Sequence, residues 1–335
     1  STTGSLHILG GEKPNISIKA SSIISDTVVL KLVPTQVSTQ KRDSLTLNFS
    51  HPSTENGEFH FELPELYQDY SYQALVNAKH FWESWETVTT APETIFVTDR
   101  PSFETFLTTI TPPKYSRLEN LTQEGNIAAI KGLKGSEILI EVTSNRPLQT
   151  AYLNLNDKKI NMVNSYDSAS GGFTLLEEGQ FTVNLVDKRG ITNRDPIAYS
   201  LEILPDNFPI LNVIKPAPII ELGNNQIIPI HLDIMDDFGF TDLQLAYEIR
   251  KPAYLQDDSF VSMFTINELL PDSIIQSVQM LWEVGDMFLM PDDEIHFHFE
   301  LTDNDNISGP KKTISNTFIA RVPSLTDLFE NITDS

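Results

Sequence analysis

The chain contains no cysteine among its 335 residues. This absence excludes disulfides, thiol nucleophiles and every metal or iron–sulfur site that needs cysteine ligands. Apolar runs of about 18 residues, the length that spans a bilayer, are also missing from the sequence. Basic residues are scarce, with 23 Lys and Arg against 46 Asp and Glu and a formal net charge of -23. Nucleic acids and anionic membranes are bound by clustered basic residues, so this composition argues against both as partners.

The short motifs that mark common enzymes are missing too. The sequence has no Gly-x-Ser-x-Gly, no His-Glu-x-x-His and no glycine-rich phosphate loop. Pairs of acidic residues are abundant, but abundance is expected in so acidic a chain and does not indicate catalysis. We therefore expect no enzyme and no cofactor. A hydrolase built on a β-sandwich is the enzymatic alternative, and converging carboxylates in a large concave pocket would support it.

Short runs of alternating polar and apolar residues recur along the chain, for example at residues 16–20, 138–142 and 294–301. This period of two is typical of β-strands with one buried face. Three stretches of about one hundred residues each end on a turn, a last strand and a proline junction, which indicates tandem domains rather than one large core. The three junctions read Val97-Thr98-Asp99-Arg100-Pro101, Leu204-Pro205-Asp206-Asn207-Phe208-Pro209 and Arg321-Val322-Pro323-Ser324.

This organisation predicts an all-β fold of three tandem immunoglobulin- or fibronectin-III-like β-sandwich domains. We place the domains at residues 1–99, 100–205 and 206–322. Residues 323–335 change character, because their apolar residues recur at intervals of three and four. That spacing is typical of one face of a helix, and we read it as the start of a truncated helix.

A series of acidic, glycine- and proline-marked segments runs through the third stretch. In order, they read Met235-Asp236-Asp237-Phe238-Gly239-Phe240-Thr241-Asp242-Leu243, Leu281-Trp282, Pro291-Asp292-Asp293-Glu294-Ile295, Glu300-Leu301-Thr302-Asp303-Asn304-Asp305, Ser308-Gly309-Pro310-Lys311 and Val322-Pro323-Ser324-Leu325. This order resembles a large bacterial family, domain-of-unknown-function family 4175. Its members look like membrane-anchored envelope proteins with transmembrane helices first, immunoglobulin-like domains next and a helical coiled-coil tail. The resemblance implies an extracytoplasmic interaction or structural module, and it brings no catalytic residues.

Two acidic loops of the third domain are candidates for a metal site. If residues 227–234 and 243–249 are strands B and C, Asp236 and Asp237 lie in the loop between them. Asp303 and Asp305 then lie in the loop between strands F and G, at the same end of the sandwich. Their carboxylates are the hard oxygen ligands that calcium prefers. The alternative is that these residues only make tight turns, for which Asp and Asn are suited.

The densest aromatic cluster of the chain is His80-Phe81-Trp82-Glu83-Ser84-Trp85, after the penultimate strand of the first domain. As a loop it would present His80, Phe81, Trp82 and Trp85 as an anchor for a protein or glycan partner. The alternative is that its aromatic rings pack against the sandwich edge or the second domain.

The sequence thus predicts a non-enzymatic structural or interaction module, the extracytoplasmic segment of a larger membrane-anchored bacterial protein. We expect it in the bacterial cell envelope, on the periplasmic or extracellular face. The alternative is a carbohydrate- or peptide-binding array of β-sandwiches that uses the aromatic loop. Nothing in the sequence identifies the partner.

Overall fold

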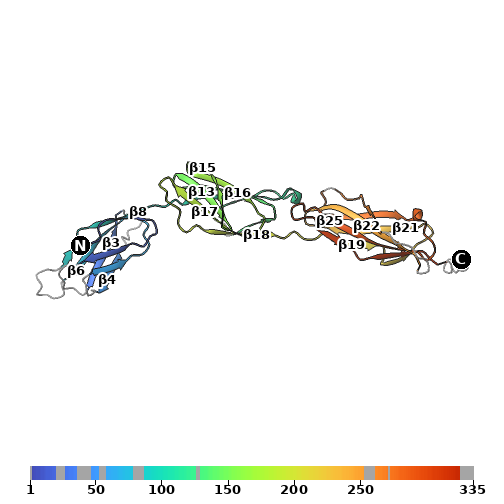
Figure 1. The fold of residues 1–335 in the computed structure, drawn as a ribbon, viewed down its shortest axis with the longest axis horizontal. Helices are drawn as coiled ribbons and strands as arrows, with labels where there is room; N and C mark the ends of the chain where they lie inside the picture. Colours follow the sequence, from blue (N-terminus) through green and yellow to red (C-terminus); the bar gives the residue numbers. More distant parts are fainter. Residues whose placement is uncertain are drawn as a thin grey trace.

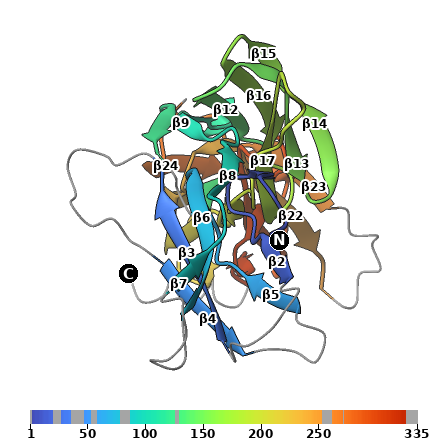
Figure 2. The same cartoon turned by 90° about the vertical axis from the view of Figure 1, so that its left-hand side faces the viewer.

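The structure, a computed structural model, describes residues 2–19, 27–35, 47–52, 58–77, 87–125, 129–252, 261–270 and 272–324. Three β-sandwich domains follow one another in a row, with the first and the third at opposite ends (Figure 1). Viewed along this row, the domains overlap (Figure 2). The predicted all-β fold of tandem immunoglobulin- or fibronectin-III-like sandwiches is confirmed. Residues 325–335, most of the predicted helix, lie outside the described residues.

The first domain packs the two-stranded sheet β2-β5 against a larger sheet in the order β1-β8-β6-β3-β4, with β7 beside β6. Its strands are β1 (Leu6–Leu9), β2 (Asn15–Lys19), β3 (Thr27–Pro34), β4 (Leu47–Pro52), β5 (Glu58–Glu62), β6 (Tyr70–Asn77), β7 (Thr87–Thr89) and β8 (Glu93–Thr98).

The second domain consists of two five-stranded sheets, in the orders β10-β9-β12-β16-β15 and β11-β18-β17-β13-β14. Its elements are β9 (Phe103–Thr111), the 3-10 helix η1 (Lys114–Ser116), β10 (Leu121–Glu124), β11 (Ala129–Leu133), β12 (Glu137–Ser144), β13 (Leu148–Leu155), β14 (Lys158–Asn161), β15 (Val163–Ser165), β16 (Ser168–Thr174), β17 (Gly179–Asp187) and β18 (Ala198–Leu204).

The third domain packs the three-stranded sheet β19-β21-β24 against the sheet β20-β27-β25-β22-β23, with β26 beside β25. Its elements are β19 (Ile210–Lys215), β20 (Ile219–Glu221), β21 (Ile227–Met235), β22 (Phe240–Arg250), β23 (Val261–Thr265), β24 (Ile275–Glu283), the 3-10 helix η2 (Gly285–Met287), β25 (Glu294–Asp303), β26 (Lys312–Ile314) and β27 (Phe318–Arg321).

One topology is repeated three times. In each domain an early strand pairs in parallel with the last long strand, as β1 with β8, β11 with β18 and β20 with β27. The other pairings between strands of the described residues are antiparallel. No sheet of the described strands crosses either of the first two proline junctions. Each of the three apolar cores consists of residues from a single domain.

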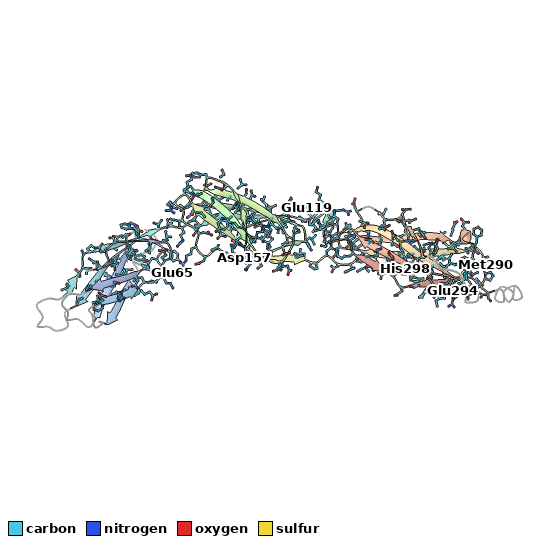
Figure 3. All side chains as sticks on the ribbon, in the orientation of Figure 1. Glu65, Glu119, Asp157, Met290, Glu294 and His298 are labelled. Atoms are coloured by element: carbon cyan, nitrogen blue, oxygen red, sulfur yellow. The ribbon has the colours of Figure 1, made fainter. Side chains whose placement is uncertain are left out.

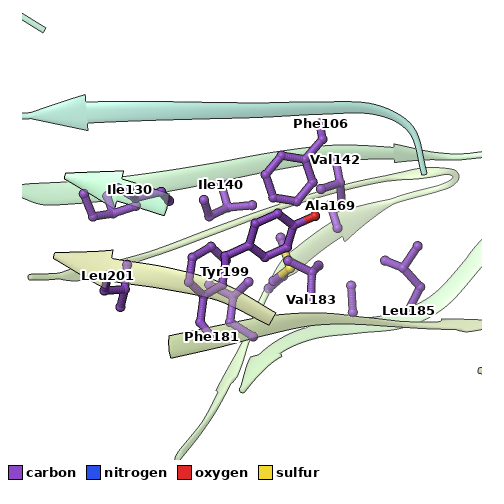
Figure 4. Packing of buried hydrophobic residues seen from close by; sticks show 14 of the residues in the cluster. Phe106, Ile130, Ile140, Val142, Ala169, Phe181, Val183, Leu185, Tyr199 and Leu201 are labelled. Atoms are coloured by element: carbon purple, nitrogen blue, oxygen red, sulfur yellow. The ribbon is translucent and has the colours of Figure 1, made fainter. Parts of the chain in front are cut away.

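The core of the second domain shows how the alternating pattern fills the space between two sheets (Figure 4). Tyr199 stacks on Phe181 and on Phe106, with ring centroids 5.1 Å and 4.9 Å apart. Phe181 comes from β17 and Phe106 from the facing sheet, so these rings join the two layers. Burial of each large apolar side chain contributes about 1.5–3 kcal/mol.

Candidate functional site: two repeated joints between domains

Two joints connect the three domains, and each is built on an aspartate that ends a strand. Alternate residues of β17 face the core, and this alternation buries Asp187, which is 2% exposed, together with Phe181 and Leu185. The alternation of β25 likewise carries Asp303 inward, where it is 1% exposed. A buried carboxylate must be hydrogen-bonded or paired with a cation. Each aspartate therefore organises the loop that follows it.

Lys311 is the cation of the joint between the second and third domains. Its Nζ lies 2.7 Å from Asp303 Oδ2, 3.2 Å from Asp206 Oδ1 and 3.5 Å from Asp305 Oδ2. Burial lowers the pKa of Lys311, but the hydrogen bonds and charges of Asp303 and Asp206 outweigh it and hold this pKa above its usual value. One ammonium thus ties the connector that carries Asp206 to the loop of the third domain.

Asp305 closes the same loop. Its Oδ1 accepts the backbone N–H groups of Ile307 at 2.8 Å and Ser308 at 3.0 Å. Burial raises the pKa of Asp305, but the lowering by these two donors and by Lys311 is larger. The net pKa is therefore below the usual value. The residue is therefore ionised at neutral pH and serves both as a turn former and as a partner of Lys311.

The second domain reaches this joint through Tyr115 in η1. The Tyr115 hydroxyl donates to Asp206 Oδ2 at 2.9 Å, and its carbonyl accepts a hydrogen bond from Asn304 Nδ2 at 3.2 Å. Its ring meets Phe238 edge-on, with centroids 5.9 Å apart. Burial, followed by the hydrogen bond to Asp206, raises the pKa of Tyr115 above its usual value. The hydroxyl therefore remains a donor across ordinary pH.

Two further contacts extend the second joint to its rim. Arg117 Nη2 lies 2.5 Å from Asp272 Oδ1, between two well-exposed side chains. Ile307 lies against Gly135, where an added Cβ would be 2.9 Å from Ile307 Cγ2. A larger residue at position 135 would require the Ile307 side chain to shift, and the φ of +87° at Gly135 is one that other residues rarely adopt.

The remaining residues of the predicted metal site lie at the same joint, in separate turns. Asp236 Oδ2 accepts the N–H groups of Phe238 and Gly239, each at 2.9 Å. Asp237 Oδ2 accepts Asn207 Nδ2 at 2.7 Å, which again links connector and domain. Burial is the main cause that raises the pKa of Asp236. The turn-forming role that the sequence left as an alternative is thus present at Asp236, whereas Asp237 holds the connector.

Calcium at this pole stays a prediction. Within the described ranges, no group of three or more His, Asp or Glu side chains has a geometry that could hold a metal ion. Lys311 places its own positive charge among Asp206, Asp303 and Asp305, so a calcium ion there would compete with a built-in ammonium. Thermal melts with calcium and with chelator decide between them, because a ligand at one hundred times its Kd stabilises by about 2.7 kcal/mol.

The joint between the first and second domains repeats the arrangement with arginine as the cation. Arg189 Nη2 lies 2.6 Å from Asp187 Oδ2 and donates to the Asp99 carbonyl at 2.7 Å. Arg146 Nη2 lies 2.7 Å from Asp99 Oδ2. Burial raises the pKa of Asp187, but the lowering by the Ile191 N–H and by Arg189 is larger. The net pKa is therefore below the usual value.

Two more arginines cross this first joint. Arg194 Nη2 lies 2.9 Å from Glu65 Oε1, and Arg194 Nη1 donates to the Gly11 carbonyl at 2.5 Å. Arg100 Nε donates to the Gly10 carbonyl at 3.1 Å. Glu65 lies at the end of the first domain that faces the second (Figure 3). Its hydrogen bonds to Arg194 and then Tyr67 lower the pKa of Glu65 to about 2.

The two joints share a plan, although Arg189 contacts the backbone carbonyl of Asp99 whereas Lys311 contacts the carboxylate of Asp206. Each connector supplies an aspartate, Asp99 or Asp206, and each penultimate long strand ends on the buried Asp187 or Asp303. The loop after that strand supplies the cation, Arg189 or Lys311, which contacts both. The sequence analysis named the acidic residues of the third domain but missed the cation. The signal for it was an aspartate at an inward-facing position of an alternating strand, which requires a partner.

An open groove of about 580 Å³ runs along the first joint. Its charged lining residues are Asp99, Arg100, Arg194 and Asp195, and each takes part in an ion pair. These groups are occupied in holding the domains together. The groove therefore does not have the converging, uncommitted carboxylates that a glycoside hydrolase needs.

A serine, a histidine and an aspartate meet on the open face of the sheet β19-β21-β24. His231 Nε2 lies 2.8 Å from Ser277 Oγ and 3.6 Å from Asp233 Oδ1. In a catalytic triad the serine and the aspartate contact different nitrogens of the ring. Here both face the same nitrogen, so the aspartate cannot orient the imidazole as a base for the serine.

On the other sheet of the third domain, His296 and His298 each lie beside a glutamate of β25. His296 Nε2 is 2.8 Å from Glu294 Oε2, and His298 Nε2 is 3.2 Å from Glu300 Oε1. Glu294 also pairs with Arg321 at 2.8 Å. These groups form a charged, partly exposed strand face.

The predicted aromatic partner-binding residues His80, Phe81, Trp82 and Trp85 lie outside the described residues. In the chain they lie between β6 and β7, and partner binding there stays a prediction. In the part of the chain that the structure describes, no helix is long and apolar enough to cross a membrane.

No protein-family model and no curated protein matches the chain. A chimeric titin Z1Z2-Z1Z2 tandem is a similar solved structure, at 15% identity and a TM-score of 0.24, covering 60% of this chain and 95% of its own. Fibronectin(III)-like modules of Clostridium thermocellum CbhA match at 13% identity and 0.22, covering 60% and 93%. A marsupial T cell receptor matches at 10% identity and 0.30, covering 94% and 99%. Likenesses of this size carry no argument about function, so the β-sandwich assignment rests on the sheets described above.

Proposed function

We propose that the chain is a non-enzymatic structural and interaction module, in which three β-sandwiches form a semi-rigid row that positions or recognises a partner. The repeated joint carries this proposal. Each connector is held by a buried aspartate and a cation, Asp187 with Arg189 and Asp303 with Lys311. A flexible tether would leave its backbone and its charges in water.

The energetics support limited rather than free hinge motion. Removal of one partner from a buried ion pair costs about 3–5 kcal/mol, because the other charge remains buried and unpaired. To open the second joint, Lys311 would have to leave Asp206, and Tyr115 would have to leave Asn304. Both connectors also carry a proline, Pro101 and Pro209, which restricts the backbone.

We further propose that the chain is the extracytoplasmic segment of a larger membrane-anchored bacterial protein. The support is the resemblance of the third domain to the envelope family, together with the absence of cysteine and the strongly acidic composition. Several of the segments that carry the resemblance gather at the second joint, including residues 235–243 and 300–305. The resemblance would then reflect how successive domains are joined.

Distances between spin labels test the row. The chain has no cysteine, so introduced cysteines label single sites. Exposed Glu62, Lys158 and Thr265 lie one in each domain. We expect narrow distance distributions for the pairs 62/158 and 158/265. Tyr115→Ala should broaden only the 158/265 distribution, and a broad 158/265 distribution in the unsubstituted chain would overturn the semi-rigid row.

Protease accessibility tests the location. In cells with an opened outer barrier and an intact cytoplasmic membrane, added protease should digest this segment of the parent protein. Protection until the cytoplasmic membrane is lysed would place it inside the cell and overturn the envelope proposal. A cytoplasmic marker protein that stays intact is the control for membrane integrity.

A further inference from the structure

We propose that the open edge of β24, residues 277–283, is a docking site for an extended, basic segment of a partner protein that adds to the sheet β19-β21-β24 as a further strand. Addition of a strand to an exposed sheet edge is a general mode of peptide recognition, in which backbone hydrogen bonds supply affinity and alternate side chains supply specificity.

The edge is long and regular, and no strand among the described residues covers it. β24 pairs with β21 over nine residues, from Ile275 to Glu283, without a bulge. Near its start, Gln276 Nε2 donates to the Glu268 carbonyl at 2.5 Å, so a loop covers that end. Along residues 277–283 no other described strand pairs with β24, which is the last strand of its sheet. Natural edges are commonly protected by charge, proline, a bulge or short length, and this one has a single charge, at Glu283.

The other domains show what occupies or protects the equivalent edge. In the second domain the corresponding strand β16 is covered by the short strand β15. In the first domain the corresponding strand β5 has five residues and exposes His60 and Glu62 beside Glu58, so charge and short length protect it. The third domain has neither device. The occupant that the repeat indicates is therefore a strand.

Leu281 is the exposed apolar residue of the edge segment, on an outer face that also carries Ser277 and Gln279. Ile275 and Leu281 of β24 are 64% and 65% exposed, because they lie on the side of the strand that faces away from the core. Ile275 pairs in register with Met235, and Met235 with Ile210, so three exposed apolar side chains line up across the sheet. That line lies just beyond the open segment, and an added strand along residues 277–283 would place its own apolar side chain beside Leu281.

Charge decides which kind of strand fits. The chain carries a net charge of -23, so a second copy is repelled and a basic segment is attracted. Beside the edge, Asp233, Glu283 and Asp286 are exposed acidic residues. Lys215, on the far strand β19, is the basic residue of the sheet's three strands. We therefore assign the edge to a segment that alternates basic and apolar residues.

A synthetic peptide that alternates lysine and valine over about eight residues, the length of a typical strand, is the probe. Fluorescence anisotropy with the full 335-residue chain measures its binding, and hydrogen exchange locates it. We expect binding and slower exchange of the β24 amides within residues 277–283. Leu281→Lys should weaken binding about tenfold, or about 1.4 kcal/mol. Val163→Lys, at an exposed position of the edge strand β15, should leave binding unchanged.

Three outcomes would overturn the inference. Equal binding of a peptide of the same charge with proline at alternate positions would show simple charge attraction. Failure to bind, or exchange protection elsewhere, would remove the site. Self-association of the chain in sedimentation that Leu281→Lys abolishes would assign the edge to a second copy. If Leu281→Lys does not fold, Gln279→Lys on the same exposed face replaces it. The inference rests on the proposed interaction role but not on the joints, so spin-label distances and peptide binding can fail independently.

Discussion

At the scale of the residue, Lys311 is the group whose loss should matter most. Lys311→Met keeps most of the volume but leaves Asp303 buried without a counter-charge. Because Asp303 retains two backbone N–H donors, we expect destabilisation of the third domain near the lower end of the range for a broken buried pair, about 3 kcal/mol. The denaturant dependence of hydrogen exchange in β25 measures this change.

The adjacent Lys312 is the matched control. Its Nζ pairs with Glu300 Oε2 at 2.6 Å, but its side chain is 45% exposed. Exposed pairs of this kind contribute about 0–1 kcal/mol, so Lys312→Met should have a small effect on the same amides. Equal effects of the two substitutions would contradict the role of Lys311 as the centre of the joint.

The lowered pKa of Glu65 leads us to expect that the first joint loosens in acid. Its folded pKa is about 2, lowered by Arg194, whereas an unfolded glutamate has a pKa of about 4.3. A folded pKa below the unfolded value means that the stabilisation is present above about pH 4.3 and is lost as the pH falls toward 2. We expect the 62/158 label distances to broaden in this window.

Arg194→Gln provides the comparison for that titration. Other carboxylates at the joint, including Asp187, also have lowered pKa values, so the difference between wild type and variant isolates Glu65. The variant should already be broadened at neutral pH and change less on acidification. Identical pH profiles for the two chains would refute the assignment to Glu65 and Arg194.

At the scale of the element, β25 is the strand that joins core and joint. Its inward residues are Ile295, Phe297, Phe299, Leu301 and then Asp303, so one alternation builds both. Phe297 is fully buried, with ring centroids 5.3 Å from Trp282 and 5.7 Å from Phe318. Phe297→Ala should therefore destabilise the third domain by about 3–5 kcal/mol.

Phe288, which is 86% exposed, is the control for this core substitution. Phe288→Ala should change stability by about 0.5 kcal/mol or less, as surface substitutions usually do. Hydrogen exchange of the β21 and β25 amides measures both variants. A comparable loss at the two positions would mean that the apolar core does not limit the stability of this domain.

Two strands of the third domain show why the sequence indicates one element more clearly than another. Residues 294–301 alternate cleanly, and β25 follows that pattern. Residues 275–283 do not, because the outward side of β24 carries Ile275 and Leu281 while the inward side carries Gln276. The pattern is mixed because the outer side of β24 carries two exposed apolar residues among polar ones.

At the scale of the whole molecule, the two joints should respond differently to salt. At the first joint, Arg194 and Glu65 are 32% and 35% exposed. At the second, Lys311 and Asp303 are 17% and 1% exposed. The screening length is about 3 Å at 1 M salt, and screening acts mainly on exposed charges. High salt should broaden the 62/158 label distances more than the 158/265 distances, and the reverse order would contradict the difference in burial.

The sequence alone determined the β class, because alternation with a period of two is a local property that each strand carries in itself. It also located the acidic pole, since Asp236 and Asp303 follow recognisable strands. It did not reveal that Asp206, Asp303 and Lys311 share one ion cluster, or that Arg189 and Lys311 have the same role. Asp206 and Lys311 lie far apart in the chain, so their pairing depends on how the connector packs against the third domain. Only the tertiary structure decided that two of the predicted metal ligands, Asp303 and Asp305, lie beside the ammonium of Lys311.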